Sequence, residues 1–440
     1  MPKDQPTETT YCSERLAAAD GSFEAVRCIM DLRADLCGSA LAARVTLTLK
    51  SLKAVAALRF NLSRTFAIRG IESSRPVAGW RRRADTVTII LRERTRAGQR
   101  MRITFEYEGP IKVRCQYDQV LTAITPEGGI LTELWFPWLF GLRARFAAAL
   151  EVPRELSAVA NAPLVGRAER GDTARITWES AGPLPGFEIA IGRYHTQKWL
   201  TERGRFCYHG YRKQPARARE MLRVFGGMLG LFQPRFGPLP YREFHLVEIP
   251  EYYRGGRGRA PMIWLAEPIF NSPLTPRFRR RFLAHEMAHF WWGNLVEGSG
   301  VGWLWLHEGF AAYSELLYLE ADAGPEAYRA AVRSFARRFG RDSKRGGERP
   351  LRSVGTNDPL CYPILYCKGA VALHRLREGI GDKAFFGALR LFCRRFGGGS
   401  ATVDDFRECA EQLGRVDLRP FFRALLDDVG LPSRRLIKRA

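Results

Sequence analysis

Apolar and polar residues alternate along much of the first half of the chain. In Val45–Leu49, Val87–Leu91 and Met101–Tyr107 every second residue is apolar. A period of two places one face of a strand on a core and the other in water. From about Ser22 to Lys198 the pattern therefore predicts an antiparallel β domain. We place this domain at residues 15–200, after a polar tail at residues 1–14.

The period shifts toward that of a helix after about Thr201. An amphipathic helix is predicted first, then two short strands separated by a Gly/Arg loop, and then a helical region broken by a long polar loop. The helices are Pro215–Phe232, Tyr366–Glu378, Asp382–Arg395, Val403–Leu413 and Pro420–Val429, with Asp382 and Thr402 as N-caps; the strands are Phe244–Ile249 and Met262–Leu265, and the loops Arg254–Arg259 and Arg341–Pro359. The fold class is therefore predicted as α+β, with a second domain of mixed α/β structure at residues 201–440.

The stretch HEMAHFWWGNLVEGSGVGWLWLHE contains a metal-site spacing. His285 and His289 stand four residues apart on a predicted helix that Thr275 and Pro276 begin, so both imidazoles leave one face and can share an ion. Eighteen residues separate His289 from Glu308, which opens another predicted helix, ending near Gly324, and could supply a carboxylate. Three protein ligands leave a fourth tetrahedral position for water, which is the pattern of catalytic zinc.

Glu286 lies beside that predicted ion. It is too close in sequence to His285 to be a comfortable ligand, but it is placed to take a proton from water and pass it on. An isolated H-E-x-x-H also arises by chance in helices, and a lone Glu308 is often only a solvated residue. Together, at this spacing, they favour a site. His307 is expected to point away from the ion and to lie either behind the metal ligands or at the surface. Asn294 is expected to cap a helix end.

These motifs, with YCKG at Tyr366–Gly369, resemble those of the gluzincin aminopeptidases, the relatives of aminopeptidase N and the leukotriene hydrolase. The resemblance implies a saddle-like β domain before a thermolysin-like zinc-peptidase domain. It also implies one zinc ion bound by His285, His289 and Glu308, with Glu286 as general base. Tyr366 would stabilise the tetrahedral intermediate. Glu315 matches a glutamate of the family pattern and would orient a ligand.

The same resemblance implies a short form. The chain ends where the family's catalytic domain ends, so the C-terminal helical domain of longer relatives is absent and a more open cleft is expected. The family's G-A-M-E-N segment, whose glutamate binds the substrate amine, corresponds to Gly256–Leu265, with Arg259 at the glutamate position. Gly256 and Gly258 would let the backbone approach a substrate. Either Glu133 or Glu267 could take over amine recognition, so exopeptidase and endopeptidase activity both stay open.

Composition bears on partners and compartment. The 69 Lys and Arg against 46 Asp and Glu give a net charge of +23, which makes nucleic acid the first partner to consider. The arginines are dispersed and no nucleic-acid-binding motif accompanies them, so a peptide substrate is favoured. Nine cysteines form no C-x-x-C pair, and the chain shows neither a signal peptide nor a transmembrane segment. These features predict a cytoplasmic protein; they indicate no oligomeric state.

The sequence predicts a zinc metallopeptidase that hydrolyses peptide bonds through an activated water. The alternative is a non-catalytic, peptidase-like module that uses the cleft or the basic surface to bind protein or nucleic acid. Retention of His285, Glu286, His289, Glu308 and Tyr366 argues for the enzyme, because a scaffold has no need of a water-activating set.

Overall fold

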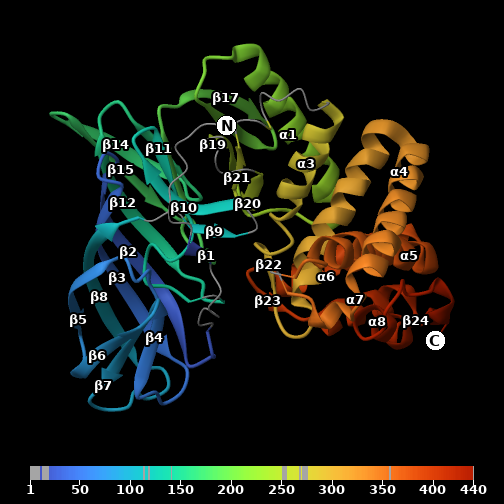
Figure 1. Cartoon of the computed structure of the whole chain (residues 1–440), viewed down its shortest axis with the longest axis horizontal. Helices are drawn as coiled ribbons and strands as arrows, with labels where there is room; N and C mark the ends of the chain where they lie inside the picture. The colour runs from blue at the N-terminus through green and yellow to red at the C-terminus, as the bar shows by residue number, and fades with distance from the viewer. Residues whose placement is uncertain are drawn as a thin grey trace.

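The computed structural model describes residues 10–11, 19–111, 114–116, 119–139, 141–249, 255–266, 269, 276–355 and 358–439. It divides into a β-rich N-terminal region and a second region in which a mixed sheet is followed by helices (Figure 1). This arrangement confirms the predicted α+β class. None of the helices in the described segments combines the length and hydropathy that crossing a bilayer requires.

The N-terminal region is built on three sheets. The largest has the order β14 (Leu164–Arg170), β15 (Thr173–Glu179), β12 (Arg145–Pro153), β2 (Phe23–Asp35), β3 (Ala40–Ser51), β8 (Arg100–Pro110), β5 (Ala67–Ser73). The second has the order β4 (Ala57–Asn61), β7 (Thr86–Leu91), β6 (Val77–Arg83). The third has the order β1 (Thr10–Tyr11), β9 (Arg114–Gln116), β10 (Gln119–Thr125), β11 (Gly128–Leu131), β16 (Ile189–Gly192), β13 (Ser157–Ala160).

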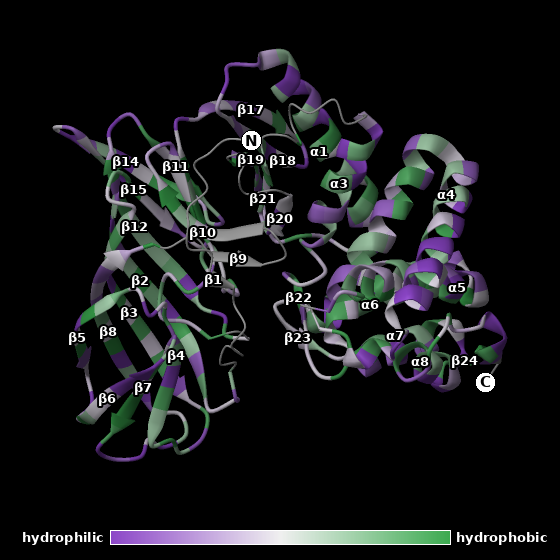
Figure 2. Cartoon of the chain, in the orientation of Figure 1, coloured by the Kyte–Doolittle hydropathy of each residue, from purple (hydrophilic) through white to green (hydrophobic). Residues whose placement is uncertain are grey.

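The predicted alternating strands are confirmed in β3, β7 and β8. Val45, Leu47 and Leu49 of β3 are buried, while the residues between them are partly exposed. The strands of Figure 2 accordingly carry alternating hydrophobic and hydrophilic residues. Pairing is mostly antiparallel, as predicted, but β12 runs parallel to β2.

A mixed five-stranded sheet begins the second region. Its order is β17 (His195–Thr201), β18 (Gly204–Gly210), β19 (Glu243–Ile249), β21 (Met262–Ala266), β20 (Gly256–Arg259), with β18, β19 and β21 parallel. Helix α1 (Pro215–Phe236) crosses from β18 to β19. Residues 256–259, predicted as part of a loop, form an edge strand antiparallel to β21. The domain limit at residue 200 stays a prediction; β17, which spans it, pairs with β18.

The two faces of this sheet contact different parts of the molecule. Phe206 and Phe244 pack into the large core that includes α1 and α3 (Pro276–Ala288). Val247 and Met262, on the opposite face, join Ala190 and its apolar neighbours from the N-terminal region. The sheet therefore separates the helix that carries the histidine motif from the N-terminal sheets.

The rest of the chain is largely helical. Its helices are η2 (Trp305–Gly309), α4 (Phe310–Gly346), η3 (Leu351–Ser353), η4 (Tyr362–Lys368), α5 (Gly369–Ile380), α6 (Asp382–Phe396), α7 (Val403–Gly414), α8 (Arg419–Leu426) and η5 (Arg434–Leu436). Two short strand pairs join them: β22 (Val296–Gly298) with β23 (Gly399–Ala401), and β24 (Val416–Asp417) with β25 (Lys438–Arg439).

Several predicted helix boundaries need correction. α4 breaks at Gly324, where φ is 82°, as the sequence suggested, but continues to Gly346, so the predicted loop from Arg341 begins later. Thr402 caps α7 with a capping box, as predicted. Asp382 is instead the first residue of α6 after the cap Gly381, and its carboxylate accepts hydrogen bonds from Arg377.

Candidate metal centre

The end of α3 supplies the two histidines. α3 begins at Pro276; Thr275, the expected N-cap, lies outside the described residues. The helix ends at Ala288, so His289 is the first residue beyond it, yet the two imidazoles remain neighbours with ring centroids 4.9 Å apart. The predicted spacing on one face therefore brings the rings together at the helix end.

Glu308 completes the set. Its Oε2 lies 3.4 Å from His285 Nε2 and 3.6 Å from His289 Nε2. Two ligands of one tetrahedral zinc, each at about 2.0–2.2 Å, lie roughly 3.3–3.6 Å apart. Glu308 Oε2 is buried and has no hydrogen-bond partner. A buried oxygen without a partner is costly, and it is accounted for here by a cation between it and the rings. The residues present therefore fit a zinc ion.

Neighbouring groups fix the ligands. His289 Nδ1 lies 3.0 Å from the carbonyl oxygen of Trp292, so the Nδ1 hydrogen is donated there and Nε2 keeps its lone pair. The ring of Tyr366 stacks on that of His285 with an interplanar angle of 7° and a centroid distance of 5.5 Å. The Tyr366 hydroxyl interacts with Glu308, which raises the pKa of the tyrosine after the larger effect of burial. The predicted ligands and the predicted tyrosine thus form one cluster.

Mutual charge governs the pKa values of this cluster. Burial opposes ionisation of Glu308, but His289, His285 and Tyr366 outweigh it and lower its pKa to about 2. Burial also opposes charging of His285, yet Glu308 and Glu286 raise its pKa to about 9. The carboxylates thus create a site that attracts positive charge, whether a proton or a metal ion.

Glu286 is buried beside the ligands. Burial is the main cause that raises its pKa, which suits a group that must accept and release a proton. The Gly258 backbone on β20 opposes this rise slightly by lowering the pKa of Glu286. A Cβ at Gly258 would lie 2.0 Å from the carbonyl oxygen of Glu286, so only glycine lets β20 approach α3 this closely. Gly258 is therefore required for the contact between β20 and α3, and the approach of a substrate to Gly256 and Gly258 stays a prediction.

Glu308 and Tyr366 both lie on π-helical turns, η2 and η4. The two turns touch around Trp305: a Cβ at Gly309 would lie 2.3 Å, and one at Gly369 2.7 Å, from its Cδ1. Trp305 Nε1 also donates a hydrogen bond to the Gly369 carbonyl. π turns often occur at functional sites. The helical periodicity of the sequence gave no sign of these wider turns, although the glycines that permit their contact stand directly after the motifs.

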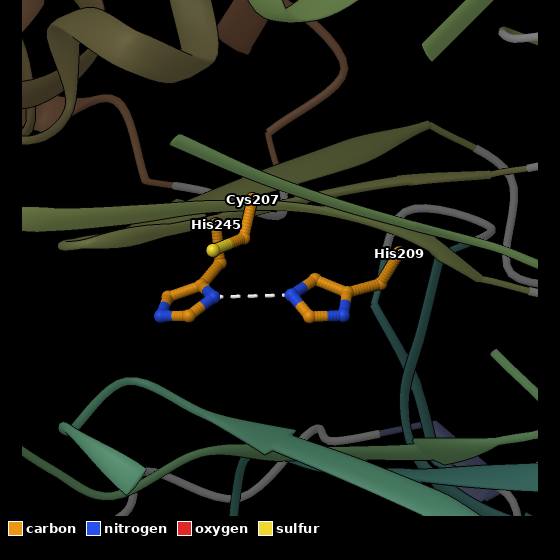
Figure 3. Close-up of side chains that lie close together, drawn as sticks. All are labelled: Cys207, His209 and His245. Atoms are coloured by element: carbon orange, nitrogen blue, oxygen red, sulfur yellow. Dashed lines mark hydrogen bonds between the residues drawn. The ribbon is translucent and has the colours of Figure 1, made fainter. Parts of the chain in front are cut away.

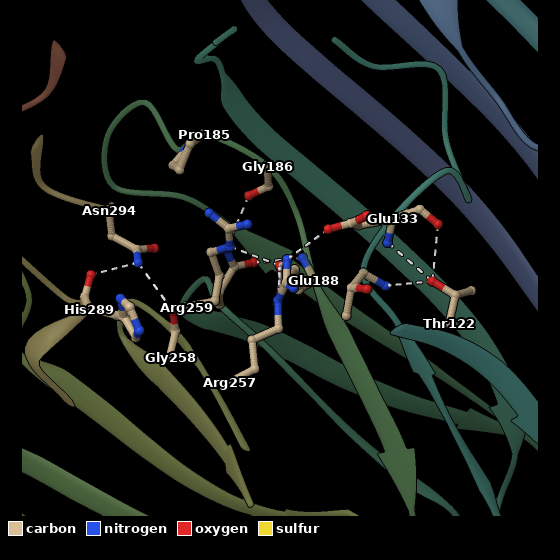
Figure 4. Close-up of polar contacts among 12 residues, drawn as sticks. Thr122, Glu133, Pro185, Gly186, Glu188, Arg257, Gly258, Arg259, His289 and Asn294 are labelled. Atoms are coloured by element: carbon tan, nitrogen blue, oxygen red, sulfur yellow. Dashed lines mark hydrogen bonds and ion pairs between the residues drawn. The ribbon is translucent and has the colours of Figure 1, made fainter. Parts of the chain in front are cut away.

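Asn294 joins the histidine helix to β20 and β21. Its Nδ2 donates to the carbonyls of His289 and Gly258, at 2.7 Å and 3.2 Å, and its Oδ1 accepts from the Ala260 backbone (Figure 4). The expected role as a helix-end cap is therefore only part of its contribution. His307 accepts a 2.8 Å hydrogen bond from the Gly298 backbone and so anchors β22 beside η2.

Glu315, predicted to orient a ligand, forms a 2.5 Å ion pair with Arg281. Arg281 precedes His285 by one turn of α3, and the charge of Glu315 contributes to the raised pKa of His285. Glu315 thus ties α4 to α3 and acts on His285 through its charge; a direct orienting role stays a prediction.

Arg259 and Glu133, two of the residues predicted to contact substrate, lie in an ion-pair network (Figure 4). Glu188 Oε1 is 2.8 Å from Arg259 Nε and 3.1 Å from an Arg257 Nη atom, and Arg257 is also 3.3 Å from Glu133. Burial opposes ionisation of Glu188, but both arginines outweigh it and lower its pKa. The sequence identified Arg259 and Glu133 but missed Glu188, which lies in the other region of the chain. Glu267 lies outside the described residues.

Comparison with known proteins agrees with this geometry. The peptidase family M1 domain matches residues 241–424, a range that includes all the candidate metal and catalytic residues. Aminopeptidase N of Streptomyces lividans is 24% identical over 313 residues, covering 66% of this chain and 36% of that protein. Aminopeptidase M1-A of Oryza sativa subsp. japonica is 25% identical over 306 residues, covering 66% and 35%. The aligned part is thus about a third of each relative.

The fold is also shared with a solved structure. The M1 zinc metallopeptidase of Deinococcus radiodurans superposes with a TM-score of 0.75 at 20% identity, covering 93% of this chain and 95% of that one. The likeness extends over both regions, so it confirms the β domain followed by the thermolysin-like domain. With the residues of the centre in place, these matches show that the second region is similar to the peptidase family M1 domain, in agreement with the predicted resemblance to the gluzincin aminopeptidases.

Proposed function

We propose that the chain is a zinc-dependent metallopeptidase that hydrolyses peptide bonds by means of an activated water. The observation that carries this proposal is the convergence of two imidazole nitrogens on a buried carboxylate oxygen that has no hydrogen-bond partner. His285, His289 and Glu308 would hold one zinc ion. When bound, zinc polarises a carbonyl and lowers the pKa of water toward about 7.

The chain's own residues perform the proton transfers. Glu286 is buried next to both histidines, accepts a proton from the attacking water and delivers it to the leaving amine. Tyr366, stacked on His285, donates its hydroxyl hydrogen to the negative charge that develops on the scissile carbonyl oxygen. Burial and the nearby Glu308 raise the pKa of Tyr366, so its hydroxyl keeps the hydrogen that it donates.

Recognition of a substrate amine is altered. Arg259 occupies the position of the family's amine-binding glutamate, and Glu133 and Glu188 are both paired with arginine. Two arginines and two glutamates balance their charges, so an ammonium group would have to compete with arginine for these carboxylates, although Glu188 Oε2 is itself buried without a hydrogen-bond partner. We therefore propose that a free amino terminus is not required, although the Deinococcus radiodurans relative is described with a Tyr-Ser-Ala substrate.

The test is hydrolysis of matched peptides that differ only in an amino-terminal acetyl group. We expect cleavage of both, its loss on treatment with a chelator and its return with zinc. Cleavage of the free peptide alone would contradict the altered specificity but not the peptidase. No cleavage of any peptide by the zinc-loaded protein would contradict the enzyme and favour the non-catalytic binding module. A cytoplasmic location stays a prediction.

A further inference from the structure

A second cluster of ligand-type side chains lies on the five-stranded sheet. Cys207 and His209 stand two residues apart on β18, and His245 is the register partner of Cys207 on the parallel strand β19. Side chains two apart on a strand share a face, and so do register partners. All three therefore project from one face, as Figure 3 shows. It is the face opposite to the one that packs against α1 and α3.

The three side chains converge. One ligand atom from each lies within 4.8 Å of the other two, and His209 Nε2 is 3.1 Å from His245 Nδ1. Two nitrogens on one tetrahedral zinc ion, at about 2.0–2.1 Å each, would lie roughly 3.3–3.4 Å apart. The separation of the two inner nitrogens is therefore within a few tenths of an ångström of the value that a shared ion requires. Cys207 is 1% exposed and each histidine 7%.

Oxygen atoms lie at the outer nitrogens of both rings. Thr196 Oγ1 is 2.9 Å from His209 Nδ1, and Glu243 Oε1 is 3.5 Å from His245 Nε2. Histidines that bind metals almost always direct their other ring nitrogen to such an acceptor. Each ring is therefore oriented with its inner nitrogen toward the partner ring and the thiol, which is the arrangement a metal site requires.

The surroundings keep the cluster uncharged. Apolar residues of the N-terminal region and of β19 and β21 cover this face of the sheet; they include Ala123, Val159, Ala190, Val247 and Met262. Burial lowers the pKa of His245 to about 4 and also lowers that of His209, while it raises the pKa of Cys207 to about 12. At neutral pH both imidazoles are thus unprotonated at one nitrogen and available as ligands.

We propose that Cys207, His209 and His245 bind one zinc ion, at a site separate from the His285–His289–Glu308 centre. The combination of one thiolate with two imidazoles suits zinc, whose ligands are cysteine sulfur and histidine nitrogen. Thr196 and Lys198 of the edge strand β17, the register partners of His209 and Cys207, are exposed, so the cluster lies at the edge of the covered face, where water can supply a fourth ligand. A purely apolar sheet interface has no need of a thiol beside two hydrogen-bonded imidazoles.

Binding of the zinc ion releases one proton from the protein. The Cys207 thiol gives up its hydrogen when sulfur bonds to the ion, and Glu243 Oε1, 3.9 Å from Sγ, is the adjacent acceptor on the way to solvent. The hydrogen now shared between the two rings moves to His209 Nδ1, where it is donated to Thr196 Oγ1. No oxidant or reductant takes part.

Cobalt substitution separates this site from the catalytic centre, which contains no sulfur ligand. The full chain is stripped with a chelator and titrated with Co²⁺, and the near-ultraviolet thiolate-to-cobalt charge-transfer band is recorded. We expect the band in the wild type and in His289→Ala, and its loss in Cys207→Ala and His209→Gln. Cys393→Ala, which removes another buried thiol, is the matched control and should keep the band.

Metal analysis after zinc loading gives an independent readout. We expect two equivalents in the wild type, one in Cys207→Ala, one in His289→Ala and none in the double variant. One equivalent in the wild type that Cys207→Ala leaves unchanged would overturn the second site and leave the peptidase proposal intact. One equivalent that only Cys207→Ala removes would overturn the catalytic centre instead. A cobalt band that persists in a folded Cys207→Ala protein would also refute the sulfur ligand.

Discussion

The two buried clusters are alike in having three ligand-type side chains and differ in how the fold assembles them. The catalytic set comes from the end of α3 and a π turn in a separate helix, and it includes a carboxylate whose pKa is lowered to about 2, by its histidine and tyrosine partners against the effect of burial. The Cys207 set stands on two neighbouring strands and stays neutral, with burial lowering the pKa of His245 to about 4. The proposed reaction centre thus differs from the proposed second zinc site in two ways: it contains a charged carboxylate, and a general base, Glu286, lies beside it.

The sharpest test of this difference is Glu286→Gln. The change removes the proton acceptor but no metal ligand, so we expect kcat to fall by about 10³-fold or more while zinc content stays the same. The measurement is peptide hydrolysis together with metal analysis of the same preparation. Glu326→Gln makes the same chemical change at an exposed residue of α4 and should retain full activity. A Glu286→Gln enzyme within tenfold of the wild type would remove the general-base role.

Tyr366→Phe tests the other catalytic group. Its ring still stacks on His285, but the hydroxyl that would donate to the developing negative charge is gone. Losing one such donor typically costs about 10²–10³-fold in kcat, and we expect that fall with little change in KM. Tyr362→Phe is the control, because its ring stacks on Tyr366 with centroids 5.0 Å apart and its hydroxyl has no proposed role. Equal effects of the two changes would contradict the assignment.

The convergence of the candidate metal ligands was predictable because these residues follow local rules. Histidines four apart on a helix meet by geometry, and the motifs around Glu308 and Tyr366 are contiguous in sequence. The alternating strands of the N-terminal region were predictable for the same reason, since a period of two follows directly from burial of one face. What the local pattern could not show was that both Glu308 and Tyr366 lie on π turns.

Contacts between distant segments escaped prediction. Glu188, which directly precedes β16, lies 69 residues before Arg257 and 71 residues before Arg259 in the chain. It meets these two arginines of β20 only in the folded protein. Cys207 and His245 are brought together by the α1 crossover between two parallel strands. The one local sign was Cys-x-His at residues 207–209, which places both side chains on one face of a strand.

Glu188→Gln tests whether the ion-pair network supports the fold. The Glu188 side chain is 2% exposed, and its loss of charge leaves the partly buried Arg259 without its carboxylate and Arg257 with Glu133 alone. Breaking a buried pair from one side costs about 3–5 kcal/mol, and the partial exposure of the arginines places the expected loss near the lower end, about 3 kcal/mol. The measurement is denaturant unfolding.

Glu179→Gln provides the contrast for that measurement. It breaks an ion pair with Arg27 in which both side chains are about half exposed, and such pairs contribute about 0–1 kcal/mol. Similar unfolding free energies for the two variants would show that burial of Glu188 carries no special cost. The ion-pair network would then have no role in stabilising the fold.

The smallest expected effect sharpens the comparison most directly. Cys207→Ala should leave kcat/KM for a peptide within about twofold of the wild type, because Cys207 points from the sheet face opposite to α3 and distant, unshared sites behave independently. The same variant should lose the rise in melting temperature that zinc gives through the second site. Activity is measured well below the melting temperature, with Cys393→Ala alongside. A large fall in kcat/KM in folded Cys207→Ala, without a similar fall in Cys393→Ala, would mean that the two clusters are coupled through the sheet. The Cys207–His209–His245 cluster would then help to position α3.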